Sequence, residues 1–341
     1  MIRDAIAKVV CGTDLSCDEA TAAMSAIMSG EATDAQIAAF AIGLRMKGET
    51  VDEISACAAV MRDKATRIHA PSDDVLDVVG TGGDAAHTFN ISTASALVAA
   101  GAGCCVAKHG NRSVSSTSGS ADVLRTLGVN IEADVATVER CLVEVGIGFL
   151  FAPSLHQAMR YAIGPRREMG VRTIFNILGP LTNPAKATRQ VIGVYDPALL
   201  ETMARALGNL GSVRCLVVHG EDGLDELTTT TNSRVCEWDE GRVRSYSVQP
   251  GMFGVRQASL DEIRVESPEE SAARIRDLLG GTQGPHRDIV ILNAGAAIYA
   301  SGKGADLPDG ARLAAESIDS GAAASVLERL VAASNTPVSD S

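Results

Sequence analysis

The stretch GTGGD at residues 80–84 follows an apolar run at residues 75–79 and precedes a helix-start pattern, NIST, at residues 90–93. Its three glycines let the backbone adopt positive φ values and approach a ligand closely, because no Cβ obstructs it. An anion binds well where a strand leads through a glycine-rich turn into a helix. The turn and the first helical residues supply unpaired amide hydrogens, and the helix dipole places its positive end there. The nearby hydroxyl and carboxylate groups, which an ordinary turn does not need, belong to Thr81, Asp84, Thr88, Ser92 and Thr93. The pattern predicts a phosphate-binding loop, with an ordinary strand–helix turn as the alternative.

Short apolar runs alternate with longer helical ones from residue 75 onward. We expect strands at residues 75–79, 104–107, 191–195, 213–218 and 289–292. Runs so uniformly apolar suit strands that are covered on both faces, as in a parallel sheet flanked by helices. Ligands bind such sheets at the carboxyl ends of the strands, which is where the glycine loop, residues 80–84, is expected to lie.

The first 70 residues differ from the rest, because they contain a helix-start signature three times. In each, a Ser or Thr is followed three residues later by Glu or Gln, and the pair satisfies amide hydrogens that the first helical turn leaves unpaired. The pairs are Ser16 with Glu19, Thr33 with Gln36, and Thr50 with Glu53. We expect a small all-helical domain at residues 1–70, part of whose apolar surface could serve a partner subunit, and an α/β domain at residues 71–341.

The composition argues against several classes of function. Aromatic residues make up 3% of the chain and the formal net charge is −12, so we expect no binding of nucleic acid or anionic membranes. No apolar run approaches the roughly 18 residues of a membrane span, and the N-terminus is charged where a signal peptide would be apolar. The eight cysteines lack metal-binding or disulfide spacing. We expect a cytoplasmic protein with reduced thiols.

Two further loops carry charged groups suited to a ligand. KHGNRSVSS at residues 108–116 directly follows an expected strand, and its cations, hydroxyls and glycine suit a pyrophosphate or a phosphosugar better than a solvated surface loop. DGLDE at residues 222–226 follows another expected strand and offers carboxylates of the kind that bind Mg²⁺ together with substrate phosphates and water. Alone, DGLDE is more typical of a solvated acidic turn. Beside two phosphate-binding loops it indicates a metal site.

A fourth block, RREMGVRTIFNILGPLTNP at residues 166–184, mixes arginines with turn-forming residues. An arginine here could hold a carboxylate through paired hydrogen bonds, whereas Asn176, Gly179 and Pro180 are typical of a hinge. For Arg167 and Arg172, a structural salt bridge and a ligand contact are both open. The chain has no GxSxG, GxxxxGK[ST] or GxGxxG motif, so serine hydrolases, P-loop NTPases and Rossmann dehydrogenases lose their main support.

In order and spacing, these four blocks, together with TFNIST at residues 88–93, resemble those of the anthranilate phosphoribosyltransferases of tryptophan biosynthesis. The resemblance implies transfer of the 5-phosphoribosyl group from phosphoribosyl pyrophosphate to the amine of anthranilate. It also implies a helical domain completed by an insertion near residues 160–188, an α/β domain of the nucleoside phosphorylase and phosphoribosyltransferase type, and a homodimer through the helical parts. One departure is Ala85-Ala86-His87, where members often carry another glycine.

The resemblance also implies roles for individual residues. Phosphoribosyl pyrophosphate is expected to contact Gly80, Gly83, Asp84, Thr88, Asn90, Ile91, Ser92, Thr93, Lys108, His109, Gly110, Asn111, Arg112, Ser113, Val114, Ser115, Ser116 and Ser120. Anthranilate is expected to contact Gly80, Asn111 and Arg166, and Mg²⁺ is expected to bind Ser92, Asp225 and Glu226. His109 is the candidate catalytic residue, as a proton acceptor.

Two other functions stay open at this point. A pyrimidine nucleoside phosphorylase has a similar architecture and also starts its second loop with Lys-His, but it needs a phosphate site in place of the DGLDE carboxylates. A non-catalytic relative that binds nucleic acid is the other, and the charge of −12 argues against it.

Overall fold

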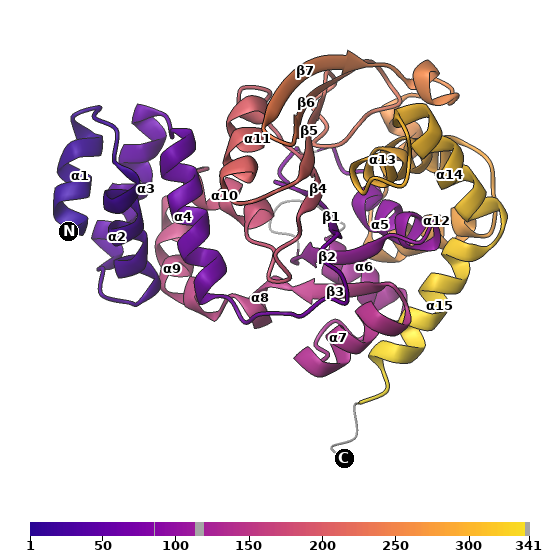
Figure 1. The fold of residues 1–341 in the computed structure, drawn as a ribbon, viewed down its shortest axis with the longest axis horizontal. Coiled ribbons are helices and arrows are strands. Elements are labelled where there is room, and N and C mark those ends of the chain that lie inside the picture. The colour runs from indigo at the N-terminus through magenta and orange to yellow at the C-terminus, as the bar shows by residue number, and fades with distance from the viewer. Residues whose placement is uncertain (85, 113–118, 338–341) are drawn as a thin grey trace.

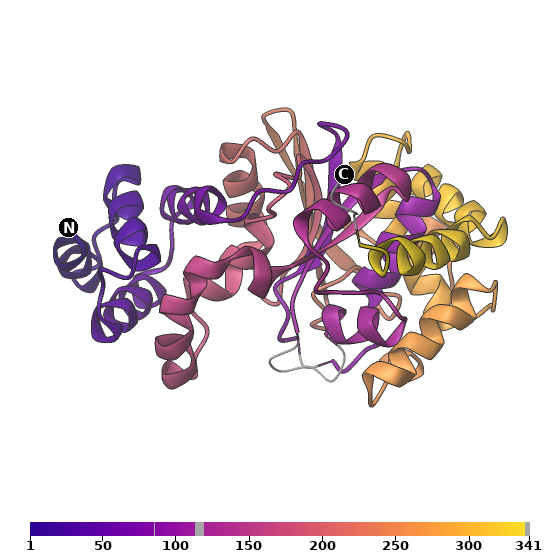
Figure 2. The same cartoon turned by 90° about the horizontal axis from the view of Figure 1, so that it is seen from below.

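The structure is a computed structural model that describes residues 1–84, 86–112 and 119–337. The predicted site residues Ser113, Val114, Ser115 and Ser116 lie outside the described residues. A bundle of N-terminal helices adjoins a central sheet, and the C-terminal helices cover the sheet on its far side (Figure 1). The view from below shows the same order, with the sheet between the bundle and the C-terminal helices (Figure 2).

The N-terminal bundle contains α1 (Ile2–Val10), α2 (Cys17–Met28), α3 (Asp34–Lys47) and α4 (Val51–Lys64). All three predicted capping pairs are confirmed, because the side chains of Ser16, Thr33 and Thr50 accept the expected amide hydrogen bonds. The apolar helix faces pack on one another around fully buried Met24 and Phe40.

Seven strands form one sheet in the order β3-β2-β1-β4-β5-β6-β7. They are β1 (Val75–Gly80), β2 (Cys105–Gly110), β3 (Ile147–Phe151), β4 (Arg189–Gly193), β5 (Arg214–Gly220), β6 (Ser233–Asp239) and β7 (Arg242–Val248). Strands β1 to β5 pair in parallel, whereas β6 and β7 are antiparallel. The predicted fold class, a small helical domain beside an α/β domain with a mostly parallel sheet, is confirmed.

The other helices surround this sheet or pack against the N-terminal bundle. They are α5 (Ile91–Gly101), α6 (Ser120–Thr126), α7 (Val135–Glu144), α8 (Ala152–Leu155), α9 (Arg160–Met169), α10 (Ile174–Leu178), α11 (Leu199–Asn209), α12 (Pro268–Leu279), α13 (Pro285–Ala300), α14 (Leu307–Asp319) and α15 (Ala322–Ser334). Both sheet faces are buried. On β1, Leu76 and Val78 join the core with α5 and α13, while Val75 joins a second core on the opposite face.

The strand expected at residues 289–292 is wrong, because this run lies inside α13 and packs against α5 and α14. A helix that is apolar on all sides gives no periodic signal, so a short apolar run cannot be distinguished from a buried strand. The expected strands also did not include β3, β6 and β7.

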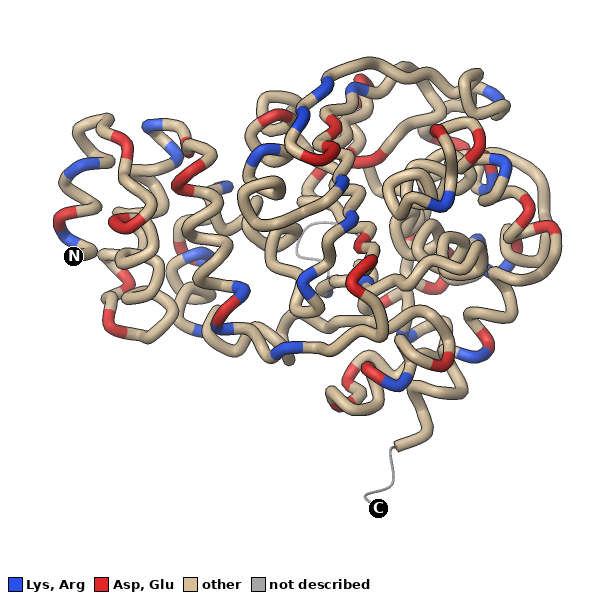
Figure 3. Tube along the Cα trace, viewed as in Figure 1, with Lys and Arg blue, Asp and Glu red and all other residues tan. Residues whose placement is uncertain are grey.

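The segment from α9 to α10 lies against the N-terminal bundle, since α9 contacts α2 and α3, and α10 contacts α3 and α4. Acidic and basic residues are interspersed along the chain in both parts of the molecule (Figure 3). Within the part of the chain that the structure describes, no helix has the length and apolar character to cross a bilayer.

A buried carboxylate connects the helices of the bundle, and its removal should destabilise the protein. Glu53, which is 0% exposed, accepts hydrogen bonds from the Leu15 amide (2.9 Å), the Thr50 amide (2.8 Å) and Lys47 Nζ (2.9 Å). We expect Glu53→Ala to lower the free energy of unfolding by about 3 kcal/mol, because it leaves the buried Leu15 amide without its acceptor and removes one of the two carboxylates that pair with Lys47. Urea denaturation measures this, and Asp52→Ala, on an exposed neighbour, should change stability by less than about 1 kcal/mol. Equal free energies of unfolding for Glu53→Ala and the wild type would contradict this stabilising role of Glu53.

Candidate active site

Glycine ends four of the five parallel strands, at Gly80, Gly110, Gly193 and Gly220. Gly80 and Gly193 pair across β1 and β4. A Cβ on Gly80 would lie 2.4 Å from Asp225 Oδ2, and one on Gly193 would lie 1.4 Å from the Asp225 carbonyl oxygen. The missing side chains therefore let Asp225 lie directly against these strand ends.

The glycine loop is held from several sides. Gly82 and Gly83 have φ values of +69° and +81°, as the glycine pattern predicts. The Thr81 amide donates to the Gly193 carbonyl (2.9 Å), and the Gly82 amide donates to Asp225 Oδ2 (2.7 Å). The loop that was predicted to bind phosphate is thus bonded to the acidic loop that was predicted to bind metal.

The predicted start of α5 is confirmed, with Asn90 as its N-cap. Asn90 Oδ1 accepts from the Thr93 amide (3.0 Å) and from the Ser92 hydroxyl (3.3 Å). The Thr93 hydroxyl is buried and has no hydrogen-bond partner among the described residues. Ile91 is 2% exposed, so a ligand contact from this residue has to come from its backbone. Thr88 pairs with Arg264 and fixes the chain between the loop and the helix.

Three carboxylates, which we call the acidic cluster, meet beside the loop: Asp84, Asp225 and Glu226. Burial, with repulsion from Asp84, raises the pKa of Asp225 to about 7. Burial and repulsion from Asp225 likewise raise the pKa of half-buried Glu226, while Lys108 and the Ser92 backbone oppose this shift. The raised pKa values mean that the free protein favours protonated, neutral forms of these carboxyls, because the surrounding protein only partly compensates their negative charge.

The acidic cluster offers oxygen ligands for a divalent cation. No His, Cys, Asp or Glu group of three is arranged as a complete metal site in residues 1–84, 86–112 and 119–337. Mg²⁺ characteristically binds one or two carboxylates and completes its shell with substrate phosphate and water. The donors therefore fit Mg²⁺ that arrives with a phosphorylated substrate.

Lys108 and His109 leave β2 on opposite faces of the sheet. Lys108 Nζ donates to the Val78 carbonyl (2.8 Å) and to the Ser92 hydroxyl (3.2 Å), which places the cation below the start of α5. Burial lowers the pKa of Lys108, whereas Asp77 and Glu226 oppose this shift.

His109 lies on the other face, with its ring centroid 5.0 Å from that of His156. Burial and the nearby His156 lower the pKa of His109 well below its usual range, so the ring is neutral at pH 7. The Gly179 backbone hydrogen-bonds the ring, while Nε2 is buried and has no partner among the described residues.

Asn111, Arg112 and Ser120 follow the end of β2. The Ser120 hydroxyl donates to the Asn111 carbonyl (3.2 Å). Arg112 pairs with Glu132 (3.3 Å) and lies 5.7 Å from the Phe151 ring centroid. Arg112 thus has a protein partner here, and its contact with pyrophosphate stays a prediction.

Arg166 and Arg172 flank the turn between α9 and α10. Arg166 is partly buried, and its guanidinium lies 5.8 Å from the Phe175 ring centroid with no ion pair in the described part of the chain. Burial lowers the pKa of Arg166. Arg172 donates to the Gly83 carbonyl, so in place of a salt bridge it has a direct bond to the glycine loop.

Sequence reasoning missed several residues that build the site. Buried Asp77 accepts from the His109 amide (3.0 Å) and from Asn183 Nδ2 (2.7 Å). Asp222, which the sequence grouped with the other DGLDE carboxylates as a possible metal ligand, instead accepts from the Thr228 hydroxyl (2.6 Å) and so shapes the loop. Gly193 is another residue that the sequence prediction did not include. It alone carried a local signal of a close backbone approach, because it is a glycine that ends an apolar strand.

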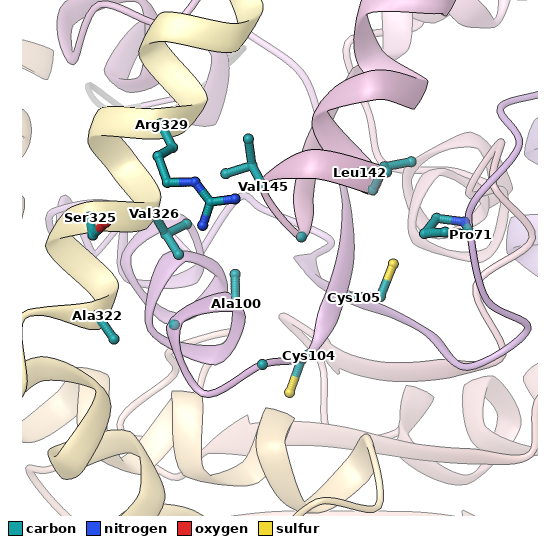
Figure 4. Close-up of a pocket in the computed structure, with 13 residues that line it drawn as sticks. Pro71, Ala100, Cys104, Cys105, Leu142, Val145, Ala322, Ser325, Val326 and Arg329 are labelled. Atoms are coloured by element: carbon teal, nitrogen blue, oxygen red, sulfur yellow. The ribbon is translucent and has the colours of Figure 1, made fainter.

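A cavity of about 390 Å³ lies at the opposite, amino-terminal edge of the sheet, between α5, α7 and α15 (Figure 4). Cys105 at the start of β2 lines it, and Arg329 of α15 extends along it. The described site residues lie instead at the carboxyl edge, where ligands of α/β sheets bind.

Two sequence families match the chain: "Glycosyl transferase family, helical bundle domain" at residues 3–65 and "Glycosyl transferase family, a/b domain" at residues 72–324. A helical bundle beside an α/β domain, with the glycine loop and acidic cluster on one sheet edge, thus defines a glycosyltransferase-family enzyme.

Curated and solved relatives narrow this class. The chain is 55% identical over 330 residues to the anthranilate phosphoribosyltransferase of Thioalkalivibrio sulfidiphilus, covering 97% of this chain and 98% of that one. It superposes on the Thermus thermophilus enzyme with a TM-score of 0.93 at 46% identity, covering 98% and 100% of the two chains. The Saccharomyces cerevisiae enzyme in complex with PRPP and Mg superposes with a TM-score of 0.88 at 27% identity, covering 98% of this chain and 97% of that one. The chain belongs to the anthranilate phosphoribosyltransferases.

Filling the space above β4 should displace the acidic loop. We expect Gly193→Ala to lower the free energy of unfolding by about 3 kcal/mol, because its Cβ would overlap the Asp225 backbone. Hydrogen exchange of the Gly82 amide should accelerate as its bond to Asp225 breaks. Gly164→Ala, inside α9, meets nothing within 4 Å and is the control: it should leave the exchange of the Gly82 amide unchanged and raise the free energy of unfolding by about 0.5–1 kcal/mol. Unchanged exchange at Gly82 in Gly193→Ala would refute the steric argument.

Proposed function

We propose that this chain transfers the 5-phosphoribosyl group from phosphoribosyl pyrophosphate to the amine of anthranilate, giving N-(5-phosphoribosyl)anthranilate and pyrophosphate in tryptophan biosynthesis. The observation that carries the proposal is the bonded pair of loops, GTGGD with DGLDE, at the carboxyl edge of the sheet in a chain of this family. One loop suits phosphate and the other suits the cation that accompanies it.

Pyrophosphate binding is assigned to the loop amides, the start of α5 and Lys108. The C1–oxygen bond to pyrophosphate breaks as the C1–nitrogen bond to anthranilate forms, so negative charge grows on the leaving group. Preorganised amides and the Lys108 ammonium then stabilise that charge. Asp225 and Glu226, with Ser92, are the proposed Mg²⁺ ligands. When bound, Mg²⁺ would supply further neutralisation of the leaving pyrophosphate.

Anthranilate is assigned to the other face of β2, beside Asn111 and Arg166. A partly buried guanidinium without an ion pair in the described residues suits the substrate carboxylate. The aromatic amine is uncharged at neutral pH, so it attacks without prior deprotonation and mainly requires orientation. The amine proton is lost after attack, and neutral His109 with its unpaired Nε2 is the proposed acceptor.

The direct test follows anthranilate fluorescence, which should fall when phosphoribosyl pyrophosphate and Mg²⁺ are both added, and should stay constant without either. The competing function, a pyrimidine nucleoside phosphorylase, predicts instead that the protein cleaves thymidine in the presence of inorganic phosphate. Thymidine phosphorolysis with unchanged anthranilate fluorescence would reject the proposed reaction.

We further propose a cytoplasmic homodimer formed through the helical bundle. Met1, Val10 and Met46 expose 75%, 67% and 83% of their surface there, which favours a second copy as the cover. All eight cysteines are free, as expected in a reducing compartment. Light scattering that gives the mass of one chain would contradict the dimer.

The acidic cluster leads to opposite predictions for activity and stability. We expect Asp225→Asn to lower kcat about 100-fold or more and to raise the Mg²⁺ concentration needed for half-maximal rate. Without Mg²⁺, its melting temperature should equal or exceed that of the wild type, because repulsion with Asp84 and Glu226 is relieved. Initial rates over a Mg²⁺ titration and thermal unfolding measure both. Glu221→Gln, on the exposed neighbour, should behave as wild type. An unchanged Mg²⁺ requirement in Asp225→Asn would refute this metal site.

Arg166 should matter chiefly for the second substrate. We expect Arg166→Ala to raise the KM for anthranilate by about 10- to 100-fold, the effect of losing a hydrogen bond between charged groups. The KM for phosphoribosyl pyrophosphate should change little, and exposed Arg167→Ala should leave both values near wild type. Steady-state kinetics with each substrate varied in turn decide this, and an effect confined to phosphoribosyl pyrophosphate would overturn the assignment.

A further inference from the structure

Arg172 connects the segment between α9 and α10 to the glycine loop. Its Nη2 donates to the Gly83 carbonyl. The same guanidinium lies 3.9 Å from the Tyr195 ring centroid, which is close stacking for a cation over an aromatic ring. An exposed arginine is thus held at two points, although its charge has no ion-pair partner in the described part of the chain.

The two contacts of Arg172 belong to the same loop network. The Tyr195 amide donates to Thr81 Oγ1 (3.1 Å), so the residue beneath the guanidinium is itself bonded to the loop. A Cβ on Gly83 would lie 2.7 Å from Arg172 Nη2, so the guanidinium occupies space that only glycine leaves open.

The bond to the Gly83 carbonyl has a directional consequence. In a trans peptide the C=O and the next N–H point to opposite sides. With the Gly83 carbonyl turned toward Arg172, the Asp84 amide hydrogen points away from it. Because glycine has no Cβ, the backbone at Gly83 could also take other φ values and turn this peptide differently. Arg172 therefore sets the direction of one amide in the loop.

Arg172 also links two parts of the fold. The helices on either side of it contact α2, α3 and α4 of the bundle, whereas Gly83 and Tyr195 follow β1 and β4 of the sheet. The guanidinium therefore bonds the bundle side of the molecule to the loop at the sheet edge.

We propose that Arg172 is a positioning residue for phosphoribosyl pyrophosphate: stacked on Tyr195, it holds the Gly83 carbonyl so that the loop amides face the pyrophosphate. This inference rests on the proposed function. It assigns Arg172 no contact with anthranilate.

Steady-state kinetics of single and double variants, at saturating Mg²⁺, test the proposal. We expect Arg172→Ala to raise the KM for phosphoribosyl pyrophosphate about tenfold, with kcat and the KM for anthranilate within about twofold of wild type. Arg172→Lys, which keeps a hydrogen-bond donor, should raise the KM for phosphoribosyl pyrophosphate less than Arg172→Ala does. Tyr195→Leu should share the defect, Tyr195→Phe should not, and Arg172→Ala with Tyr195→Leu should be no worse than Arg172→Ala alone.

Arg160→Ala is the matched control, because Arg160 also stacks on a tyrosine, 4.7 Å from the Tyr161 ring centroid, but has no bond to the loop among the described residues. It should leave both KM values near wild type. A raised KM for anthranilate in Arg172→Ala, normal kinetics in that variant, or a wild-type Tyr195→Leu would each overturn the proposal. Failure of the proposed function is separate, since the wild-type protein would then not consume anthranilate at all.

Discussion

The site depends on one steric constraint, which is that the backbone carries no Cβ where β1 and β4 end. Glycine at residues 80 and 193 lets the Asp225 main chain and carboxylate lie directly on these strand ends. From there the carboxylate accepts the Gly82 amide. The glycine loop and the acidic loop, which are far apart in the sequence, therefore form one unit whose geometry is set by two paired strands in the middle of the sheet.

The same close packing makes the acidic cluster electrostatically unfavourable. Asp225 is 8% exposed, and its raised pKa records both the loss of hydration and the repulsion from Asp84. Lys108 and the Ser92 backbone offset only part of this for Glu226. Under the proposed function, a cation that enters with the substrate would relieve this repulsion, so the repulsion would strengthen the binding of the cation and substrate. Stability lost at a site of this kind is commonly balanced by the rest of the fold, here by two extensive apolar cores.

The sequence predicted those features that local physics determines. Capping pairs such as Thr50 with Glu53, and the glycine loop before Asn90, are encoded within a few residues, and both appear as expected. The strand predicted at residues 289–292 was wrong, because the sequence of a helix that is buried on all sides has the same continuous apolar pattern as a buried strand. The contacts between Arg172 and Gly83, and between Gly193 and Asp225, join distant parts of the chain. The glycine at residue 193 signals a close approach, but no local pattern shows which distant residue makes either contact. Motifs can therefore nominate site residues, but the fold determines which of them touch.

Strand β2 illustrates how the fold separates the tasks of neighbouring residues. The alternation of side chains along a strand sends Lys108 toward Ser92 and the start of α5, and sends His109 toward His156 and the α9–α10 side. A shift of one residue in the pairing of β2 would exchange these two environments. Buried Asp77 opposes such a shift, because it accepts the His109 amide. This carboxylate, which contacts neither proposed substrate, thus preserves the register that keeps the proposed phosphate side and the proposed anthranilate side of β2 apart.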